Sequence, residues 1–600
     1  MHSQPELSDL GDFTTGPRVL TIAMMAVAIG SVCAYVAWVL LKLIGIFTNL
    51  FFYQRWGTDL VSPAGNTLGL FVIIVPVIGA LIIGLMARYG SERIRGHGIP
   101  EAIEAILING SRVEPKVAIL KPISSAISIG SGGPFGAEGP IIMTGGAIGS
   151  LIAQFFHLTS AERKTLLVAG AAAGMSATFA APVSSVLLAV ELLLFEWKPR
   201  SMIPVALAAA TAAAMRRYIL GLGPLFPVPP HSIFIGPQGL AACVVAGFLA
   251  GGLSALLTLA VYAAEDSFQK LPIHWMWWPA IGGLVIGLGG LVFPQALGVG
   301  YDTIGSLLQG DVPSRIIIGI LVVKSIIWSV SLGSGTSGGV LAPLLMMGGA
   351  LGGIEAMIFP YEGVGFWPLV SMGAILGGTM RSPFTGVVFA LELTHDVNIL
   401  MPLLIAVTIA HGFTVLTLGR SILTEKVARR GFHMSREYSV DPLEILFARE
   451  VMRSNIVALP AGASLDTLKT SLHVDPTRGP QRLYPLVDEE GTLQGVVTRV
   501  DLQGFVDRAH TGSAEALETI VRRTPTIVHP AEPLRVVVHR MAESGLTRFP
   551  VVEHGTSKLV GMIALDDLLK ARALNLEAER RRERVLNVRL AFPLAFRRSS

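Results

Sequence analysis

Long apolar runs dominate the first 440 residues of the chain. The runs at 19–50, 67–87, 238–264 and 313–332 are long enough to cross a bilayer, which takes about 20 apolar residues. Shorter runs, interrupted by Gly or Pro, lie near 101–109, 140–156, 165–180, 182–195, 339–359, 365–378, 383–394 and 397–418. Irregular backbone at membrane depth survives where protein buries it or where it lines a wet cavity, so these interruptions predict broken helices around a pathway. Kinked spans packed by small residues are the alternative.

An internal repeat favours broken helices. Residues 130–153 align without a gap on 333–356 at an offset of 203, and residues 180–193 match 381–394 at an offset of 201. Interrupted helices at matching places in duplicated halves are typical of transporters, whose site lies near the midplane of the bilayer. The number of spans between the copies would decide whether they are parallel or inverted, and the hydropathy pattern leaves both open.

The pattern changes after residue 440. Residues 441–600 contain 22 Lys+Arg and 20 Asp+Glu, a far higher density of charge than in the first part. The strand-like runs 484–487 and 495–502 recur as 549–552 and 561–568, with helical segments between them. This region is predicted to form a pair of small α/β modules in water.

These patterns divide the chain as follows: an N-terminal segment 1–17, a membrane domain 18–432 with repeats at about 18–220 and 238–432, a linker 433–449, modules at 450–510 and 515–575, and a basic tail 576–600. In the tail, Arg580, Arg581 and Arg582 belong either to a charged helical end or to an arm that faces water or lipid headgroups.

The composition excludes several classes of protein. Hydrophobic residues make up 52% of the chain and charged residues 15%, which indicates an integral, multi-pass membrane protein. A net charge of +4 gives no indication of a nucleic-acid partner. Cys33 and Cys243 lie in apolar stretches, so neither a disulfide framework nor a Cys-based metal site is expected. The start of the chain lacks the basic region of a signal peptide, so the first run should remain as a span.

Two glycine-rich loops are candidates for an anion site. Gly130 to Pro140 opens the apolar run 140–156, and Gly333 to Pro343 opens its copy. The first turn of a helix presents free N–H groups and the positive end of the dipole, and glycines let an ion approach the backbone. We expect the two loops to converge at the midplane; the alternative is that the glycines only permit close helix packing.

Glu138 is a carboxylate in an uncharged stretch that runs from Ser124 to Thr159, and its duplicate position holds Leu341. An ionisable residue at membrane depth is costly and is therefore a functional candidate. At a helix N-terminus it could compete with an anion for the same N–H groups and leave when protonated, which would make it a gate. The alternative is a plain helix cap.

Three motifs in order, GHGIP at 96–100, GAEGP at 136–140 and GVLAP at 339–343, resemble the anion-pathway signatures of the CLC family of chloride channels and chloride–proton exchangers. RSPFTGVVFALELT and SILTEKVARRG resemble late helices of that family, and the modules at 450–580 resemble its paired CBS domains. The resemblance implies an all-α membrane domain with inverted repeats of broken helices, a cytoplasmic α/β CBS pair, and a homodimer with one pathway per subunit.

The resemblance also implies the site residues. Glu138 would be the gate. The anion-binding positions would be Gly96, His97, Gly98, Ile99, Pro100, Gly136, Ala137, Glu138, Gly139, Pro140, Gly339, Val340, Leu341, Ala342, Pro343 and Leu423.

The chain departs from the family at three of these positions. His97 stands where Ser is usual, and its imidazole either coordinates chloride or turns aside to cap its loop. Leu423 replaces the central tyrosine, and Leu341 replaces an aromatic ring. Both substitutions loosen the constriction and favour channel-like passage.

The inner proton glutamate of exchangers would fall on Leu192, counted from Pro182. Glu191 lies one residue earlier, rotated by about 100° around a helix. Since Glu392 matches Glu191 in the second copy, we interpret both as scaffold residues rather than proton carriers; Glu355 is an unassigned candidate. The leading hypothesis is therefore a chloride channel gated by Glu138, and the alternative is chloride/proton antiport by a non-standard internal route.

Other classes are weaker. A divalent-cation path would need several converging oxygens, whereas the loops offer amides and one carboxylate. An enzyme is not expected, because no HExxH, GxSxG or P-loop motif stands at the membrane boundary.

The CBS modules resemble nucleotide sites in which an Asp contacts ribose and a Ser or Thr three residues earlier contacts phosphate. These positions are Asp501 with Thr498, and Asp567 with Ala564. An adenine nucleotide is one expectation, and a purely structural pair is the other. The chain is expected in a bacterial inner membrane with its CBS pair in the cytoplasm.

Overall fold

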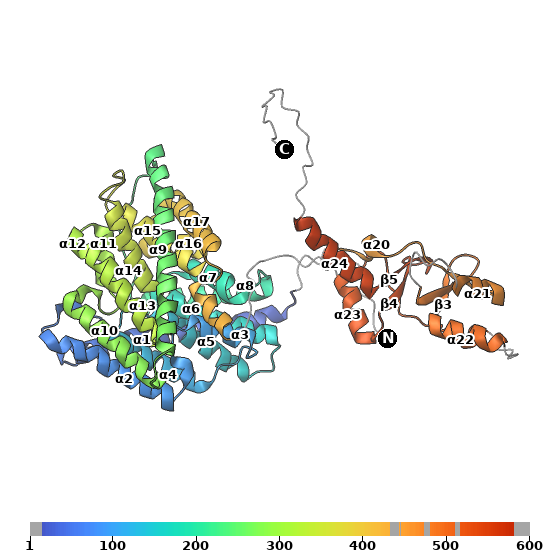
Figure 1. Cartoon of the computed structure of the whole chain (residues 1–600), viewed down its shortest axis with the longest axis horizontal. Helices are drawn as coiled ribbons and strands as arrows, with labels where there is room; N and C mark the ends of the chain where they lie inside the picture. Colours follow the sequence, from blue (N-terminus) through green and yellow to red (C-terminus); the bar gives the residue numbers. More distant parts are fainter. Residues whose placement is uncertain (1–14, 432–442, 444–445, 473–480, 511–516, 581–600) are drawn as a thin grey trace, which may run out of the picture. The chain divides into compact units, whose positions relative to one another are not determined.

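The computed structural model describes residues 15–431, 443, 446–472, 481–510 and 517–580. The chain forms two compact units, Met1–Arg436 and Glu437–Ser600 (Figure 1). Arg581 and Arg582 of the basic tail lie outside the described residues.

The first half of the membrane unit consists of helices of very different length. They are α1 (Arg18–Tyr53), α2 (Ile74–Tyr89), α3 (Ile99–Leu107), α4 (Pro115–Gly130), α5 (Glu138–Gln154), α6 (Ser160–Phe179), α7 (Pro182–Leu188), which continues as the π-helical turn η5 (Ala189–Leu194), and α8 (Pro199–Ile219).

The second half repeats this order. Its helices are α9 (Pro237–Gln269), α10 (Trp278–Val292), α11 (Tyr301–Gln309), α12 (Ser314–Gly319), which continues through η8 (Ile320–Lys324) into α13 (Ser325–Gly333), α14 (Leu341–Glu355), α15 (Phe366–Met380), α16 (Pro383–Thr394) and α17 (Leu400–Thr417). A last helix, α18 (Ile422–Arg429), follows.

The duplication is visible in the packing. α1 packs against α8, and its twin α9 packs against α17; α5 packs against α6, and α14 against α15. The twins α7 and α16 contact each other, and each receives a cap at its start from a glutamate near the other's end, Glu392 and Glu191. Twin helices that pair start to end run antiparallel, so the two halves are inverted relative to each other, as predicted.

Six helical stretches in the described residues are long and apolar enough to span a membrane. They are Arg18–Tyr53, Gly69–Tyr89, Pro237–Gln269, Trp275–Val292, Ser314–Gly333 and Val397–Arg429. The expected run 397–418 coincides with η9 (Val397–Ile399) and α17, but its grouping with the short runs is wrong, because it belongs to a stretch long enough to span. The other interrupted runs form helices of at most 17 residues, as the spacing of Gly and Pro predicts, except 165–180, which forms the 20-residue α6.

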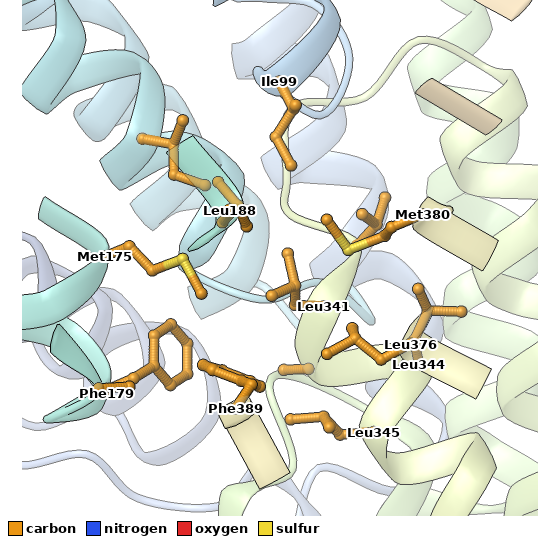
Figure 2. Packing of buried hydrophobic residues seen from close by; sticks show 14 of the residues in the cluster. Ile99, Met175, Phe179, Leu188, Leu341, Leu344, Leu345, Leu376, Met380 and Phe389 are labelled. Carbon is orange, nitrogen blue, oxygen red and sulfur yellow. The ribbon is translucent and has the colours of Figure 1, made fainter. Parts of the chain in front are cut away.

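The core of the membrane unit surrounds the starts of the short helices. Phe179 at the end of α6 and Phe389 in α16 meet edge to face, with ring centroids 5.2 Å apart. Figure 2 shows these rings beside Leu341 and Leu344 at the start of α14. Leu341 is completely buried, so the first turn of α14 is shielded from lipid.

The second unit contains two similar modules with separate cores. The first has β1 (Leu459–Pro460), α21 (Leu465–Leu472), β2 (Leu483–Val487), β3 (Leu493–Thr498) and α22 (Arg499–His510), with sheet order β1-β2-β3, and η11 (Leu517–Thr519) packs at its core. The second has α23 (Leu534–Ser544), the antiparallel pair β4 (Arg548–Val552) and β5 (Leu559–Ala564), and α24 (Leu565–Arg580), and the short helix α20 (Ala448–Val451) packs into its core. The predicted repeat of strands is confirmed.

Candidate functional site

The two twinned glycine loops meet. Gly136 N–H donates to the carbonyl of Gly339 at 3.1 Å, and Gly339 N–H donates to the carbonyl of Gly136 at 2.8 Å. This antiparallel bridge places the starts of α5 and α14 beside each other. The prediction that the loops converge is confirmed, although they come from residues about 200 positions apart.

The first signature loop joins the same cluster. Gly96 N–H donates to the carbonyl of Thr336 at 3.2 Å, and the carbonyl of Gly96 accepts from Gly338 N–H at 3.4 Å. Gly98 has φ of +90°, and a Cβ there would lie 2.5 Å from the carbonyl oxygen of Gly139. Position 98 therefore needs glycine on both conformational and steric grounds.

Glu138 is fully buried at the start of α5, but its side chain reaches the other half of the protein. Its Oε1 accepts the N–H of Ala342, in the first turn of α14, at 3.1 Å. Its Oε2 has no hydrogen-bond partner among the described residues. No side chain caps α5. The carboxylate is thus not a plain cap of its own helix; it sits on a helix N-terminus where an anion could bind.

The loop glycines make room for this carboxylate. A Cβ at Gly339 would lie 2.6 Å from Glu138 Oε2, and a Cβ at Gly136 would overlap the same carboxyl group. Ala137, Val340 and Ala342 are fully buried around it. Positions 136 and 339 therefore leave room for the Glu138 carboxylate only because they carry no side chain.

His97 is buried, and its Nδ1 has no hydrogen-bond partner among the described residues. Glu101 caps this loop instead, because its Oε2 accepts the N–H of Gly98 at 2.8 Å. Glu101 is itself paired with Lys426 of α18 at 2.6 Å. In the described residues, Nδ1 of His97 therefore makes no bond to its loop, and the loop is capped by Glu101.

A cavity of about 510 Å³ opens beside His97. It is lined by α3, the end of α9, the loop before α14, and α18. The charged residues on its wall are the cations Arg93, Arg95, Lys426, Arg429 and Arg430 and the anions Glu92, Glu101, Glu104 and Glu265. The guanidinium of Arg95 lies 4.4 Å from the ring of Trp275. Most of these charges are paired with each other, Lys426 with Glu101, Arg430 with Glu104 and Arg95 with Glu92, so the wall is polar and close to neutral.

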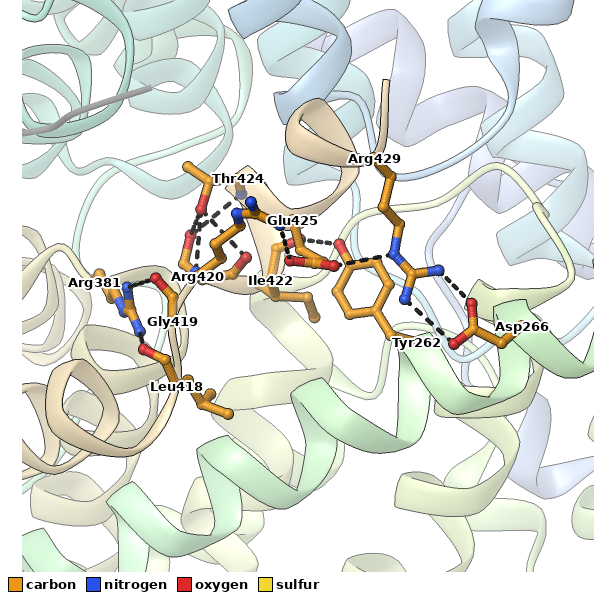
Figure 3. Close-up of polar contacts among 11 residues, drawn as sticks. Tyr262, Asp266, Arg381, Leu418, Gly419, Arg420, Ile422, Thr424, Glu425 and Arg429 are labelled. Atoms are coloured by element: carbon orange, nitrogen blue, oxygen red, sulfur yellow. Dashed lines mark hydrogen bonds and ion pairs between the residues drawn. The ribbon is translucent and has the colours of Figure 1, made fainter. Parts of the chain in front are cut away.

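Leu423 is completely buried in the first turn of α18 and supplies no hydroxyl. The start of α18 is instead anchored by Tyr262 of α9, whose hydroxyl donates to the carbonyl of Ile422 at 2.5 Å (Figure 3). Arg429 covers the Tyr262 ring and bonds to Asp266 and Glu425. This network fixes the short helix, but it does not replace a tyrosine hydroxyl at the position of Leu423.

Two buried lysines escaped the sequence reasoning. Lys121 Nζ donates to the carbonyls of Ile94 and Gly96, at 2.8 and 2.7 Å, and to a serine hydroxyl. Lys324 Nζ donates to the carbonyls of Ala296 and Gly298, at 3.0 and 2.8 Å. The offset of 203 relates the two lysines, and this was the signal that could have found them. Each lysine holds the loop before a nine-residue helix, α3 or α11.

Three further glutamates that the sequence offered as candidates are Glu191, Glu392 and Glu355, and each is bonded to groups outside the loop cluster. Glu191 and Glu392 cap α16 and α7, as interpreted. Glu355 is the last residue of α14, about 21 Å along the helix from Leu341, and accepts a bond from Ser371 at 2.5 Å. Leu192 is buried and carries no ionisable group.

The two CBS modules differ at their candidate nucleotide positions. In the first, the Thr498 hydroxyl donates to Asp501 at 2.6 Å, and Asp501 remains exposed. In the second, Asp567 is buried and paired with Arg453 at 2.6 Å, and it also accepts the N–H of Ala564. The carboxylate of Asp501 is therefore accessible to a ligand, whereas that of Asp567 is occupied.

A duplicated membrane fold in which short helices start around the buried Glu138 carboxylate is the arrangement of an ion-transport protein. Comparison with known proteins is consistent with this class: residues 78–415 match the family described as voltage gated chloride channel, and residues 448–507 and 517–574 match the CBS domain. The chain belongs to this chloride channel family, which comprises multi-pass membrane proteins that transport anions.

Individual relatives carry different names. The chain is 28% identical over 367 residues to a ClcB-like chloride channel protein of Ralstonia nicotianae, covering 60% of this chain and 85% of the relative. It is 28% identical over 412 residues to the H(+)/Cl(-) exchange transporter ClcA of Klebsiella pneumoniae, covering 64% and 84%. A solved slow cyanobacterial Cl-/H+ antiporter has the same fold, with a TM-score of 0.61, 20% identity, and coverage of 70% of this chain and 99% of that one.

Proposed function

We propose that the chain exchanges chloride for protons across the membrane, with Glu138 as the group that both ions displace. The observation that carries the proposal is the bond from the Ala342 N–H to the Glu138 carboxylate. This amide belongs to a helix N-terminus, which binds a carboxylate or a chloride ion by the same donors and dipole. Protonation removes the charge that holds the carboxyl there, so an arriving proton and an arriving chloride both favour its release.

The names of the relatives support exchange over the conduction that the sequence led us to favour first. The ClcA relative, which the chain matches over 84% of its length, is named an exchange transporter. Exchange needs a proton path from the inner side, and Leu192 offers none. The cavity of about 510 Å³ beside His97 is large enough for a chain of water molecules, each of which takes about 30 Å³. Water in this cavity would carry the proton toward Glu138.

Chloride conduction is the second candidate, and Leu192 and Leu423 favour it because both lack the polar group that the exchanger pattern has. Purified protein in vesicles with a chloride gradient, and with valinomycin clamping the voltage, separates the two functions. Exchange predicts uphill proton movement that reverses with the chloride gradient. Chloride flux without any coupled proton movement would contradict exchange and establish conduction. Vesicles of the Glu138→Ala variant serve as the uncoupled control.

We further propose a homodimer that buries the outer faces of α7, α8, α16 and α17. Large apolar side chains are exposed there, including Val183, Ile203, Phe384 and Met401. These helices are twins in pairs, so a second copy can cover them symmetrically. Chemical cross-linking in detergent should trap a dimer, and Phe384→Trp should weaken it. A monomer at all concentrations would contradict this.

The CBS pair is proposed to lie in the cytoplasm of a bacterial cell, with the membrane unit in the inner membrane. The bacterial relatives support this location. A reporter fused after the second module should be active only if it stays in the cytoplasm. An adenine nucleotide is proposed at Thr498 and Asp501, the accessible pair of the first module.

A further inference from the structure

The start of α11 is a second copy of the first signature loop. Residues 298–302, GVGYD, align on GHGIP at an offset of 202. Gly298 and Gly300 have φ of +65° and +79°, as Gly96 and Gly98 have +85° and +90°. Tyr301 is the first residue of α11 and takes the place that Ile99 has in α3. The second copy therefore adds a phenol where the first has a hydrocarbon.

The Tyr301 hydroxyl is buried and has no hydrogen-bond partner among the described residues. Its ring is fixed by edge contacts to Phe179 and Phe226, with centroids 6.4 and 6.0 Å away. A buried hydroxyl without a partner is costly, so we expect another group to form a hydrogen bond with it in some state of the protein. Oε2 of Glu138 is another buried oxygen without a partner in the described residues, and Glu138 lies within electrostatic range of Tyr301.

Tyr301 also lines a cavity of about 310 Å³ between α11 and the loop after α8. Its lining includes Phe226, Asp302 and Gln309. Because the two halves are inverted, this cavity beside α11 and the cavity beside α3 open toward opposite faces of the membrane. Tyr301 thus lies between the Glu138 site and the opposite face.

We propose that Tyr301 receives the Glu138 carboxyl group when it leaves the Ala342 amide. The phenol donates a hydrogen bond to the displaced carboxyl and so stabilises the open state of the gate. This inference rests on the proposed role of Glu138 as the exchanging group. Tyr301 acts as a positioning residue. It does not bind the transported ion, but it changes the equilibrium between the carboxyl bound at the Ala342 amide and the displaced carboxyl.

The charged groups around Tyr301 are few in the described part of the chain. Asp302 follows it on α11 and faces the cavity. Lys324 of η8 lies close to Gly300, with its Nζ 3.8 Å from a Cβ placed there, and donates to the loop carbonyls. Glu138 is the group from α5. The effect of removing the phenol on the pH response must therefore be measured both with and without Glu138, and Asp302 must be kept in every variant.

The test measures chloride efflux from vesicles as a function of pH for wild type, Tyr301→Phe, Glu138→Ala and the double variant. Phe keeps the ring contacts and removes the hydroxyl. Loss of one hydrogen bond to the open state changes the gate equilibrium about fivefold, which moves the pH of half-maximal efflux about 0.7 units toward acid. In the Glu138→Ala background Tyr301→Phe should have no effect. Tyr218→Phe, at an exposed site, is the matched control.

Two results would overturn the inference: an unchanged pH profile in Tyr301→Phe that elutes and melts like wild type, or an equal loss of efflux with and without Glu138. The second result would assign the hydroxyl to the ion or to the scaffold. If Glu138→Ala alone keeps the wild-type pH profile, the gate itself fails, whatever Tyr301→Phe does. The failure of the proposed function and the failure of this inference are thus distinguishable.

Discussion

Glu191 and Glu392 cap each other's helices. Glu392, in α16, caps the first turn of α7, and Glu191, in the π-helical continuation of α7, caps the first turn of α16. Glu392 accepts the N–H groups of Val183 and Ser184, both at 2.8 Å. Glu191 accepts the N–H of Thr385 at 2.9 Å and its hydroxyl at 2.6 Å. The exchange joins α7 to α16 through charge-assisted bonds at two helix N-termini. This arrangement supports a scaffold role for both residues.

Replacing either glutamate with glutamine should lower stability without changing the response to pH. The amide keeps the size of the side chain but loses the charge that two N–H groups share, which costs about 1–2 kcal/mol of unfolding free energy. Thermal unfolding of the purified protein measures this loss of stability. Chloride efflux measured as a function of pH shows whether gating by Glu138 is unchanged. Glu114→Gln, at an exposed site, should change neither. Loss of proton coupling in well-folded Glu191→Gln would make Glu191 a proton carrier after all.

Glu138→Gln should abolish the acceleration of chloride movement by acid. In the wild type, the carboxylate holds the Ala342 amide at high pH, and protonation weakens this bond, so flux should rise as pH falls. Glutamine has no proton to gain, so its flux should be flat across the same range. Chloride efflux at several pH values checks the sign. A Glu138→Gln profile that still rises toward acid would move the titrating group elsewhere, with His97 the first suspect.

The sequence predicted the parts of this fold that depend on repetition and length. Four of the six candidate spans, the convergence of Gly136 with Gly339, and the strand repeat follow from patterns that local chemistry imposes. The bounds of the run at 397–418 agree with η9 and α17, but the run was wrongly grouped with those too short to span the membrane.

The two lysine contacts were beyond sequence reasoning because their acceptors are mostly backbone carbonyls. Lys121 and Lys324 bind carbonyl groups, which have no residue identity to recognise. Glu101 and Lys426 are over 300 positions apart and meet only in the folded chain. The role of α11 was missed for a different reason: GVGYD shares only its glycines with GHGIP, so the match is visible once the backbone shows the same positive φ angles.

Lys121→Met should destabilise the protein more than Lys324→Met. Lys324→Met removes two bonds and leaves the carbonyls of Ala296 and Gly298 without this donor. Lys121→Met removes three: the bond to Ile94, the bond to Gly96, whose carbonyl keeps only the 3.4 Å bond from Gly338 N–H, and the 3.1 Å bond to Ser337 across the two halves. Each buried acceptor left unpaired costs about 1–3 kcal/mol, partly offset because a buried ammonium is no longer desolvated. Unfolding followed by tryptophan fluorescence should show the larger drop for Lys121→Met. An equal drop for both variants would mean that the bond to Ser337 contributes nothing.

His97→Ala should weaken chloride binding about fivefold, the effect of one lost hydrogen bond, whereas His97→Ser should largely retain it. The imidazole of His97 lies beside the loop cluster, and its Nδ1 has no hydrogen-bond partner in the described residues, so it can donate to chloride. Calorimetric titration of chloride into protein in detergent measures the affinity. His274→Ala, in an exposed turn, is the control. Unchanged affinity in His97→Ala would show that His97 is not a chloride ligand.

The full-length protein should bind one adenine nucleotide per chain, at the first CBS module. Asp501 is exposed and bonded to Thr498, so it can turn to a ribose hydroxyl, whereas Asp567 is buried and held by Arg453 at 2.6 Å. Asp501→Ala should therefore reduce affinity for AMP or ATP at least tenfold, about 1.4 kcal/mol, within the range for a hydrogen bond to a charged group. Calorimetric titration gives both the number of sites and the affinity.

Variants of the second module test whether its Asp567 is a structural residue rather than a nucleotide ligand. Asp567→Ala removes a buried ion pair and should lower the unfolding temperature of this unit while leaving nucleotide affinity unchanged. Asp566→Ala, its exposed neighbour, should change neither quantity. Two nucleotides per chain would show that the Arg453 pair opens to admit a ligand. No heat and no thermal shift with AMP, ADP or ATP would instead make the CBS pair a structural element, and Thr498 and Asp501 would then act only as the cap at the start of α22.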